Sequence, residues 1–231
     1  MSPPAQHIDR EFQKELQDLR DHLLRMGGRV EEMVHLAVQA LVEDDMALAE
    51  RTIRLDNAVN QDERDIDERC VRMLARWQPM ASDLRLITFG FKVVTDFERV
   101  GDLAVNICER AQELHGDGVK ESWAEIAVMA GRVTEMLTRA LDAFSKVDDA
   151  AARAVIGLDD AVDDDYHRIF RGQLERVRGE GGEALVQHCI RVQNVCKSLE
   201  RIGDHCTNIA ERTVFLAGGT DLRYTGPRGV R

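Results

Sequence analysis

The chain has 231 residues, with 31 Lys and Arg against 42 Asp and Glu, so its formal net charge is −11 at pH 7. This charge argues against a general nucleic-acid surface, which needs clustered Lys and Arg, and it is compatible with a cation or a basic protein as partner. Aromatic residues make up 5% of the chain and only four residues are proline, a composition typical of helical proteins.

The first half of the chain predicts three helices. The first covers about residues 8–42, and the second follows an N-cap at Asp45. Pro79 ends the second helix, because the residue before a proline is biased away from helical geometry. Ser82 is the predicted cap of a third helix that extends to about residue 114.

The second half repeats this plan after a glycine-containing linker at residues 115–118. A fourth helix is expected over about 120–146, and a fifth begins at a cap on Asp148 and extends to about residue 178. The sixth covers about 183–216. Long helices joined by short turns form antiparallel bundles, so the predicted fold class is all-α, with two elongated three-helix bundles related by pseudo-symmetry.

An internal duplication supports the two bundles. Residues 98–109 are ERVGDLAVNICE, and residues 200–211 are ERIGDHCTNIAE, a repeat that we call the acidic cassette. A longer block, residues 26–62, recurs with many identities at residues 129–165. A period of about 100 residues exceeds that of a solenoid and fits a duplicated small domain. The predicted boundaries are 8–115 and 119–217, followed by a flexible tail at 218–231.

The cysteines and histidines offer little chemistry. The five cysteines include no C-x-x-C pair and are expected to be buried, reduced thiols rather than a redox or zinc site; they are Cys70, Cys108, Cys189, Cys196 and Cys206. His205 lies in the second cassette, where the first has Leu103, and is expected to be a surface side chain. No nucleophile-and-base arrangement and no Walker or H-E-x-x-H motif is present.

Each cassette places carboxylates on one helix face. Glu98 and Asp102 are four residues apart, as are Glu200 and Asp204. Such like-charged pairs repel by about 0.2–0.5 kcal/mol on an exposed helix, whereas hard cations bind carboxylate oxygens. The same faces continue with candidate outer ligands: Asn106 and Glu109 in the first cassette, and Asn208 and Glu211 in the second.

A neighbouring helix of each bundle supplies matching ligands. The first half offers Asp56 and Asn60, and the second half offers Asp159 and Asp163. Carboxylates on facing bundle helices are an established way to build metal sites. Each cassette also contains a helical glycine, which costs about 1 kcal/mol relative to alanine. We therefore expect that glycine to permit the close approach of a backbone, an ion or a partner.

The alternative is an ordinary charged surface. Arg99 and Arg201 lie three residues before Asp102 and Asp204, and Lys197 lies three residues before Glu200, so helical ion pairs could neutralise much of the charge. Glu98 has no basic residue at positions 94, 95 or 101. A metal site and a solvated or salt-bridged face both stay open on this reasoning.

The cassette ERxGDxxxNIxE, present twice, resembles the PhoU family of phosphate-signalling regulators. Residues 65–102 are similar to that family's first-repeat signature, and residues 219–226, GTDLRYTG, resemble its usual C-terminal end. The resemblance covers about residues 10–226. It implies two three-helix bundles in a protein without catalytic activity of its own.

The resemblance also implies partners and a cofactor. It implies a homodimeric negative regulator of the phosphate-starvation response, coupling the ATP-binding subunit of a phosphate ABC transporter to a sensor histidine kinase. The chain lacks an apolar run of about 18 residues and a signal-peptide core, so we expect it in the cytoplasm, held at the inner face of the membrane by these partners.

Family members carry metal ions at E/D-x-x-x-D motifs, here matched by both cassettes and by Asp159 with Asp163, while Asn60 departs from the motif. The expected ion is divalent or trivalent Fe, Mn, Mg or Zn. Because an amide replaces a carboxylate at Asn60, we expect the second site to bind cations more tightly than the first. The competing interpretations are a helical di-metal carboxylate enzyme and a metal-free helical scaffold.

Overall fold

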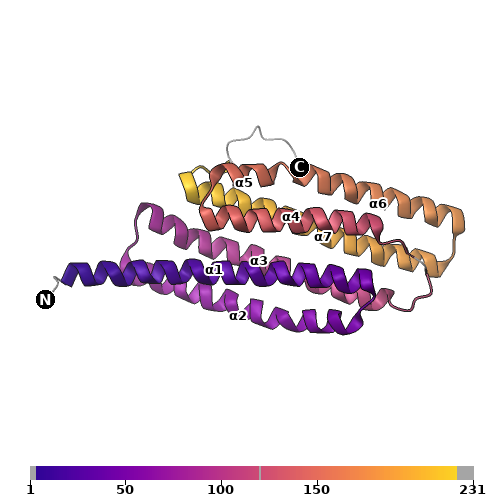
Figure 1. The fold of residues 1–231 in the computed structure, drawn as a ribbon, viewed down its shortest axis with the longest axis horizontal. Helices are drawn as coiled ribbons and strands as arrows, with labels where there is room; N and C mark the ends of the chain where they lie inside the picture. Colours follow the sequence, from indigo (N-terminus) through magenta and orange to yellow (C-terminus); the bar gives the residue numbers. More distant parts are fainter. Residues whose placement is uncertain (1–3, 120, 223–231) are drawn as a thin grey trace.

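The computed structural model describes residues 4–119 and 121–222. Within these residues the secondary-structure elements are seven α-helices and no strands (Figure 1). This confirms the predicted all-α class. The helices are α1 Pro4–Glu43, α2 Met46–Trp77, α3 Ala81–Leu114, α4 Ala124–Lys146, α5 Asp149–Ile156, α6 Asp159–Glu180 and α7 Glu183–Gly218.

Most predicted helix ends are confirmed. The Asp45 carboxylate accepts from the Leu48 amide at 2.9 Å, and the Asp148 carboxylate accepts from the Ala151 amide at 3.0 Å. Each bond satisfies an N–H group that has no partner in the first helical turn. Helix α2 ends ahead of Pro79, as expected. The Ser82 cap is wrong, because the N-cap of α3 is Met80, two residues earlier, and it makes no side-chain cap hydrogen bond.

The predicted fifth helix is in fact two helices. Helix α5 ends at Ile156 and α6 begins at Asp159, with Gly157 as the C-cap of the first. Glycine weakens a helix interior, and Asp159 with Asp160 favours a new helical N-terminus through the helix dipole. The linker before α4 is also longer than predicted, because α4 starts at Ala124 rather than near residue 120.

The two halves form two bundles that lie side by side, α1–α3 and α4–α7 (Figure 1). Helices α3 and α7 pack against each other at the centre, and α1 also contacts α4. The α1–α4 contact is close at Gly27, because an added Cβ there would lie 2.5 Å from Leu141 Cδ2. The last helix of each bundle, which carries the acidic cassette, therefore lines the seam between the bundles.

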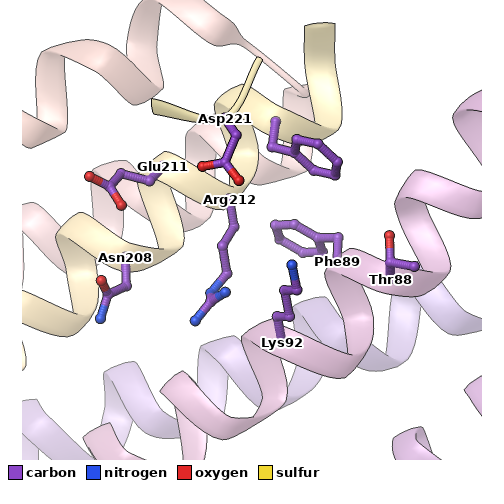
Figure 2. A pocket seen from close by; sticks show the side chains of 8 residues that line it. Thr88, Phe89, Lys92, Asn208, Glu211, Arg212 and Asp221 are labelled. Carbon is purple, nitrogen blue, oxygen red and sulfur yellow. The ribbon is translucent and has the colours of Figure 1, made fainter. Parts of the chain in front are cut away.

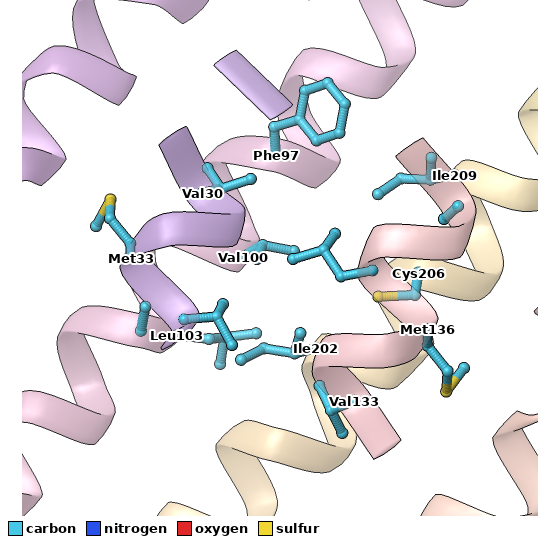
Figure 3. Packing of buried hydrophobic residues seen from close by; sticks show 14 of the residues in the cluster. Val30, Met33, Phe97, Val100, Leu103, Val133, Met136, Ile202, Cys206 and Ile209 are labelled. Atoms are coloured by element: carbon cyan, nitrogen blue, oxygen red, sulfur yellow. The ribbon is translucent and has the colours of Figure 1, made fainter. Parts of the chain in front are cut away.

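One hydrophobic core runs through both bundles. Val100 and Leu103 of α3 lie opposite Ile202 and Cys206 of α7 in this seam (Figure 3). The duplicated units thus share buried surface across the seam. Of the tail predicted at 218–231, Gly218 belongs to α7, and residues 223–231 lie outside the described residues.

The five cysteines are free and buried, as predicted. Burial raises the pKa of the Cys70, Cys108 and Cys196 thiols to about 12. A thiol with such a pKa is a poor nucleophile at neutral pH, because the thiolate is the reactive form. Within residues 4–119 and 121–222, no helix has the length and hydropathy needed to cross a bilayer.

Candidate cation-binding site

The cassette glycines face a neighbouring helix in each half. A Cβ on Gly101 of α3 would lie 3.5 Å from Asp56 Oδ1 of α2. A Cβ on Gly203 of α7 would lie 3.4 Å from Asp159 Oδ1 of α6. Each glycine therefore faces the first acid of the predicted opposing pair, at a distance that is ordinary for van der Waals contact. The acids of α3 and α2, and of α7 and α6, lie on adjoining surfaces.

On the first of these surfaces, between α2 and α3, neighbouring carboxylates repel one another. Burial, together with the charge of Asp102, raises the pKa of Asp56, although a 2.6 Å hydrogen bond from Asn60 lowers it. Burial and the Asp102 charge likewise raise the pKa of Glu98 against the opposing effect of Arg99. These carboxylates disfavour one another's ionised forms, so a bound cation would relieve a repulsion that is already present.

Two further acids join this surface that sequence reasoning missed. Burial raises the pKa of Glu63, and the charges of Asp67 and, to a smaller extent, Asp102 raise it further. Burial raises the pKa of Asp67 itself. The signal was present in the sequence, because positions 56, 60, 63 and 67 follow helical spacing along one face of α2. We call Asp56, Asn60, Glu63, Asp67, Glu98 and Asp102 the first acidic face.

The donor set of the first acidic face suits a hard cation. Asp56 Oδ1 and Asp67 Oδ1 are buried atoms without a hydrogen-bond partner. An unpaired buried carboxylate oxygen is costly, and carboxylate oxygens are the ligands preferred by Mg²⁺, Mn²⁺ and similar ions. In the conformation described for residues 4–119 and 121–222, no three His, Cys, Asp or Glu side chains are grouped as a formed metal site. Binding would therefore require side-chain rearrangement.

Ion pairs with Arg99 reduce the negative charge of the first acidic face. Arg99 contacts both cassette acids, at 3.4 Å from Glu98 Oε2 and 3.2 Å from Asp102 Oδ2. The prediction that Glu98 has no nearby cation is therefore wrong, because Arg99 is the next residue in the chain. The Arg99 side chain is 53% exposed, and exposed pairs of this kind contribute roughly 0–1 kcal/mol, so Arg99 neutralises the face only in part.

The corresponding face of the second half contains its own cation. Lys197 Nζ lies 2.6 Å from Glu200 Oε2 and 5.5 Å from the Tyr166 ring centre. Burial would lower the pKa of Lys197, but the hydrogen bond and charge of Glu200 prevail and raise it. Tyr166 and Phe170 occupy the positions that Glu63 and Asp67 hold in the first half. We call Asp159, Asp163, Tyr166, Lys197, Glu200 and Asp204 the second acidic face.

The duplicated sequence matches a known domain twice. The description of this domain is "PhoU domain", and the matches cover residues 23–111 and 126–213. The chain belongs to the PhoU family. The resemblance inferred from the cassettes is thereby confirmed, and each PhoU domain corresponds to one bundle.

Similar proteins cover nearly the whole chain. A PhoU homolog of the phosphate-specific transport system from Pseudomonas aeruginosa is 44% identical, over 95% of this chain and 90% of that protein. The accessory protein PhoU of Escherichia coli K12 is 36% identical over the same shares. These names describe accessory proteins and not enzymes, in agreement with the prediction that the chain has no catalytic activity of its own.

Solved PhoU structures share the fold. The crystal structure of PhoU from Pseudomonas aeruginosa has a TM-score of 0.86 at 41% identity, over 90% of this chain and all of that one. A phosphate transport system regulatory protein PhoU from Streptococcus pneumoniae has a TM-score of 0.84 at 27% identity, over 91% and 99% of the two chains. The paired-bundle architecture is therefore that of the PhoU fold.

The outer polar residues of the PhoU cassettes lie toward the seam. Asn208 donates to Asp96 of α3 at 3.4 Å, and Asn106 lines a crevice between α3 and α7. Glu211 lines another crevice with Asn208 (Figure 2), and Glu109 lies 3.5 Å from Arg110. The two amides thus face the neighbouring bundle, away from the acids that α2 and α6 contribute.

The surroundings of His205 differ from the prediction. Its Nδ1 lies 3.0 Å from Asp96 Oδ1, and its side chain is 17% exposed. The expectation of a surface side chain is wrong because the second bundle packs against the first at this position. A single sequence does not reveal that seam, since the packing partner is more than 100 residues away in the chain.

Proposed function

We propose that this protein is an accessory regulator of a phosphate transport system. The observation that carries the proposal is membership of the PhoU family over both repeats. Relatives that align over 95% of the chain are named as accessory proteins of phosphate-specific transport. The fold agrees with the PhoU structure named for regulation of phosphate transport. A helical chain without a recognisable nucleophile and base suits a role in binding.

The finer proposal concerns partners. The protein would bind the ATP-binding subunit of a phosphate ABC transporter and a sensor histidine kinase, and would repress the phosphate-starvation response when phosphate is plentiful. It would act as a homodimer in the cytoplasm, at the inner face of the membrane through these partners. Long bundles with extended exposed faces can contact two proteins at once, which supports such a coupling role.

The acidic faces are proposed to bind divalent or trivalent Fe, Mn, Mg or Zn. In the first half the ligands would be Asp56, Asn60, Glu98 and Asp102, joined by Glu63. In the second half they would be Asp159, Asp163, Glu200 and Asp204. A bound ion would neutralise carboxylate repulsion and supply a positive charge, which can attract phosphate or a partner's acidic group.

The order of affinity follows from the surroundings of each face. The sequence argument favoured the second site, because Asp163 replaces Asn60. The contacts support the opposite order. Glu63 adds negative charge to the first face, whereas Lys197 already neutralises Glu200 in the second. We therefore infer that the first face binds a cation more tightly.

Metal titration tests the cation sites. Metal-stripped protein is titrated with Mn²⁺, and bound metal is measured for the wild type, for Glu98→Gln with Asp102→Asn, and for Glu200→Gln with Asp204→Asn. The first pair of substitutions should remove more bound metal, by at least about tenfold in affinity for the tighter site. Equal losses, or a larger loss from the second pair, would reverse the inferred order.

Partner binding tests the regulatory role separately. The purified protein is offered the transporter ATPase subunit and the cytoplasmic part of the kinase in a pull-down and in a surface-binding assay. Binding without turnover of a phosphoester supports the adaptor role. Metal-dependent turnover with no binding to either partner would instead establish an enzyme.

A further inference from the structure

Two crevices lie along the seam between α3 and α7, and they are related by the internal duplication. The first crevice is lined by Thr88, Phe89 and Lys92 of α3 and by Asn208, Arg212 and Phe215 of α7, with Glu211 and Asp221 (Figure 2). The second is lined by Leu103, Asn106 and Arg110 of α3 and by Asn194, Lys197, Ser198 and Arg201 of α7. Asn106 and Arg110 are the cassette counterparts of Asn208 and Arg212.

The protein fills the anion position beside the first crevice with its own carboxylate. Asp96 of α3 is 4% exposed. Its oxygens accept from His205 Nδ1 at 3.0 Å, from Asn208 Nδ2 at 3.4 Å and from Arg212 Nε at 2.5 Å. The Asp96 carboxylate thus takes the place that a free oxyanion would occupy among an arginine, an amide and an imidazole.

The second crevice has the donors but lacks the carboxylate. Ser198 occupies the position that corresponds to Asp96. Ser198 is 7% exposed, and its hydroxyl forms no hydrogen bond with the rest of the described chain. Its hydroxyl lies at the wall of the crevice, where it can donate to or accept from a ligand.

Charge in the second crevice points to the same kind of ligand. Its lining includes Arg110, Lys197 and Arg201 and no Asp or Glu, although the chain as a whole is strongly acidic. Arg201 forms no ion pair with a residue that the structure describes. Arg110 lies 2.9 Å from Glu113 and Lys197 lies 2.6 Å from Glu200. The Arg110 and Lys197 side chains are 28% and 49% exposed, so each can contact a bound anion while it keeps its carboxylate partner.

We propose that the second crevice is a binding site for a tetrahedral oxyanion of the phosphate class. Arg110, Lys197 and Arg201 supply positive charge, Asn106 and Asn194 supply amide donors, and the Ser198 hydroxyl lies at the position where Asp96 stands in the first crevice. The crevice encloses about 280 Å³, enough for a small oxyanion and water. One donor is missing relative to the first crevice, because Leu103 replaces His205, and Lys197 and Arg201 compensate with charge.

The site would couple the anion to the packing of the two bundles, because its donors come from α3 and α7. It deepens the proposed regulatory function and rests on it for the choice of phosphate over other oxyanions. It shares Lys197 with the second acidic face, but no ligand of the bound anion would be a metal ion.

The test is calorimetric titration of the purified full chain with inorganic phosphate, in the presence of a chelator that removes metal ions. We expect saturable binding. Ser198→Asp places a competing carboxylate in the crevice, and Arg201→Ala removes an exposed cation, so each should weaken phosphate binding by at least about tenfold. The control Arg171→Ala changes an exposed arginine of α6 that lines neither crevice, and it should bind like the wild type.

A second arm distinguishes the source of the phosphate group. Binding to vesicles with anionic phospholipid, but not to zwitterionic vesicles or free phosphate, and its loss in Arg201→Ala, would assign the site to a lipid headgroup. Absence of binding in both arms, or binding that neither variant weakens, overturns the site. If circular dichroism shows that Ser198→Asp is misfolded, Arg201→Ala decides. Partner binding that persists without phosphate binding would overturn this site and leave the regulatory role standing.

Discussion

The two halves of the molecule keep the same cassette and use it in different electrostatic settings. In the first half, Glu98 and Asp102 lie near Asp56, Glu63 and Asp67, and burial with mutual repulsion raises the pKa of several of these acids. In the second half, Lys197 neutralises Glu200, and Tyr166 and Phe170 stand where the first half has two acids.

The seam between the bundles shows the same divergence, with the first half again the more acidic. There the first half provides the buried carboxylate of Asp96, and the second half provides Ser198 at the equivalent place. Features that set the approach of helices, such as Gly101 and Gly203, are common to both halves. Duplication thus retained the packing of helices around the cassette glycines, while substitutions at a few side chains changed the charge of each surface.

The largest expected difference between the halves is at the seam. Asp96→Ala should lower the free energy of unfolding by about 2–3 kcal/mol, because it leaves Arg212 and His205 without their buried acceptor. Its counterpart Ser198→Ala should change stability by less than about 0.5 kcal/mol, because the hydroxyl has no partner in the described chain. Urea unfolding in phosphate-free buffer measures both, and equal losses would refute the comparison of the two crevices.

The second prediction concerns the feature that the halves share. Gly101→Leu and Gly203→Leu should each cost about 1–3 kcal/mol, because the side chain would enter the space held by Asp56 with Val59, or by Asp159 with Val162.

Thermal unfolding checks the effect of these glycine substitutions. The control is Gly28→Leu, where an added Cβ meets nothing within 4 Å, and this variant should be neutral or slightly stabilised. A loss at only one of the two cassette glycines would show that the halves differ in helix packing as well as in charge.

The smallest effect is electrostatic and opposite in sign between the halves. In metal-free protein, Glu98→Gln should stabilise by about 0.5 kcal/mol because it removes a repelling charge. Glu200→Gln should be neutral or destabilising, because it weakens the bond to Lys197. Differential scanning calorimetry at neutral pH compares the two variants, and stabilisation by Glu200→Gln alone would contradict the assignment of the strained face.

The pH dependence follows from the same residues. The raised pKa values of Asp56, Glu63, Asp67 and Glu98 mean that the folded protein holds these protons more tightly than the unfolded chain. Their contribution to stability is therefore present below the ordinary carboxyl pKa and is lost as pH rises through the raised values. Glu98→Gln should flatten this decline at pH values above the ordinary carboxyl pKa. Saturating Mn²⁺ should do the same if the face binds it.

Sequence reasoning captured the features that depend on local pattern. The helical class, the duplication, two of the three proposed caps and the buried cysteines all follow from periodicity, repeats and residue type. The break at Gly157 was missed, because one glycine in a long helical pattern is often tolerated. Glu63 and Asp67 were overlooked although they continue the spacing of Asp56 and Asn60.

The sequence by itself determined that two similar helical units each carry an acidic cassette opposite a second set of polar residues. Only the tertiary structure decided what surrounds those residues. It brought Asp96 of α3 to His205 and Arg212 of α7 across the seam. It also placed Lys197 of α7 near the Tyr166 ring of α6. The reason is physical: helix periodicity fixes which residues share a face, but the charge and solvation of that face depend on residues brought close by packing.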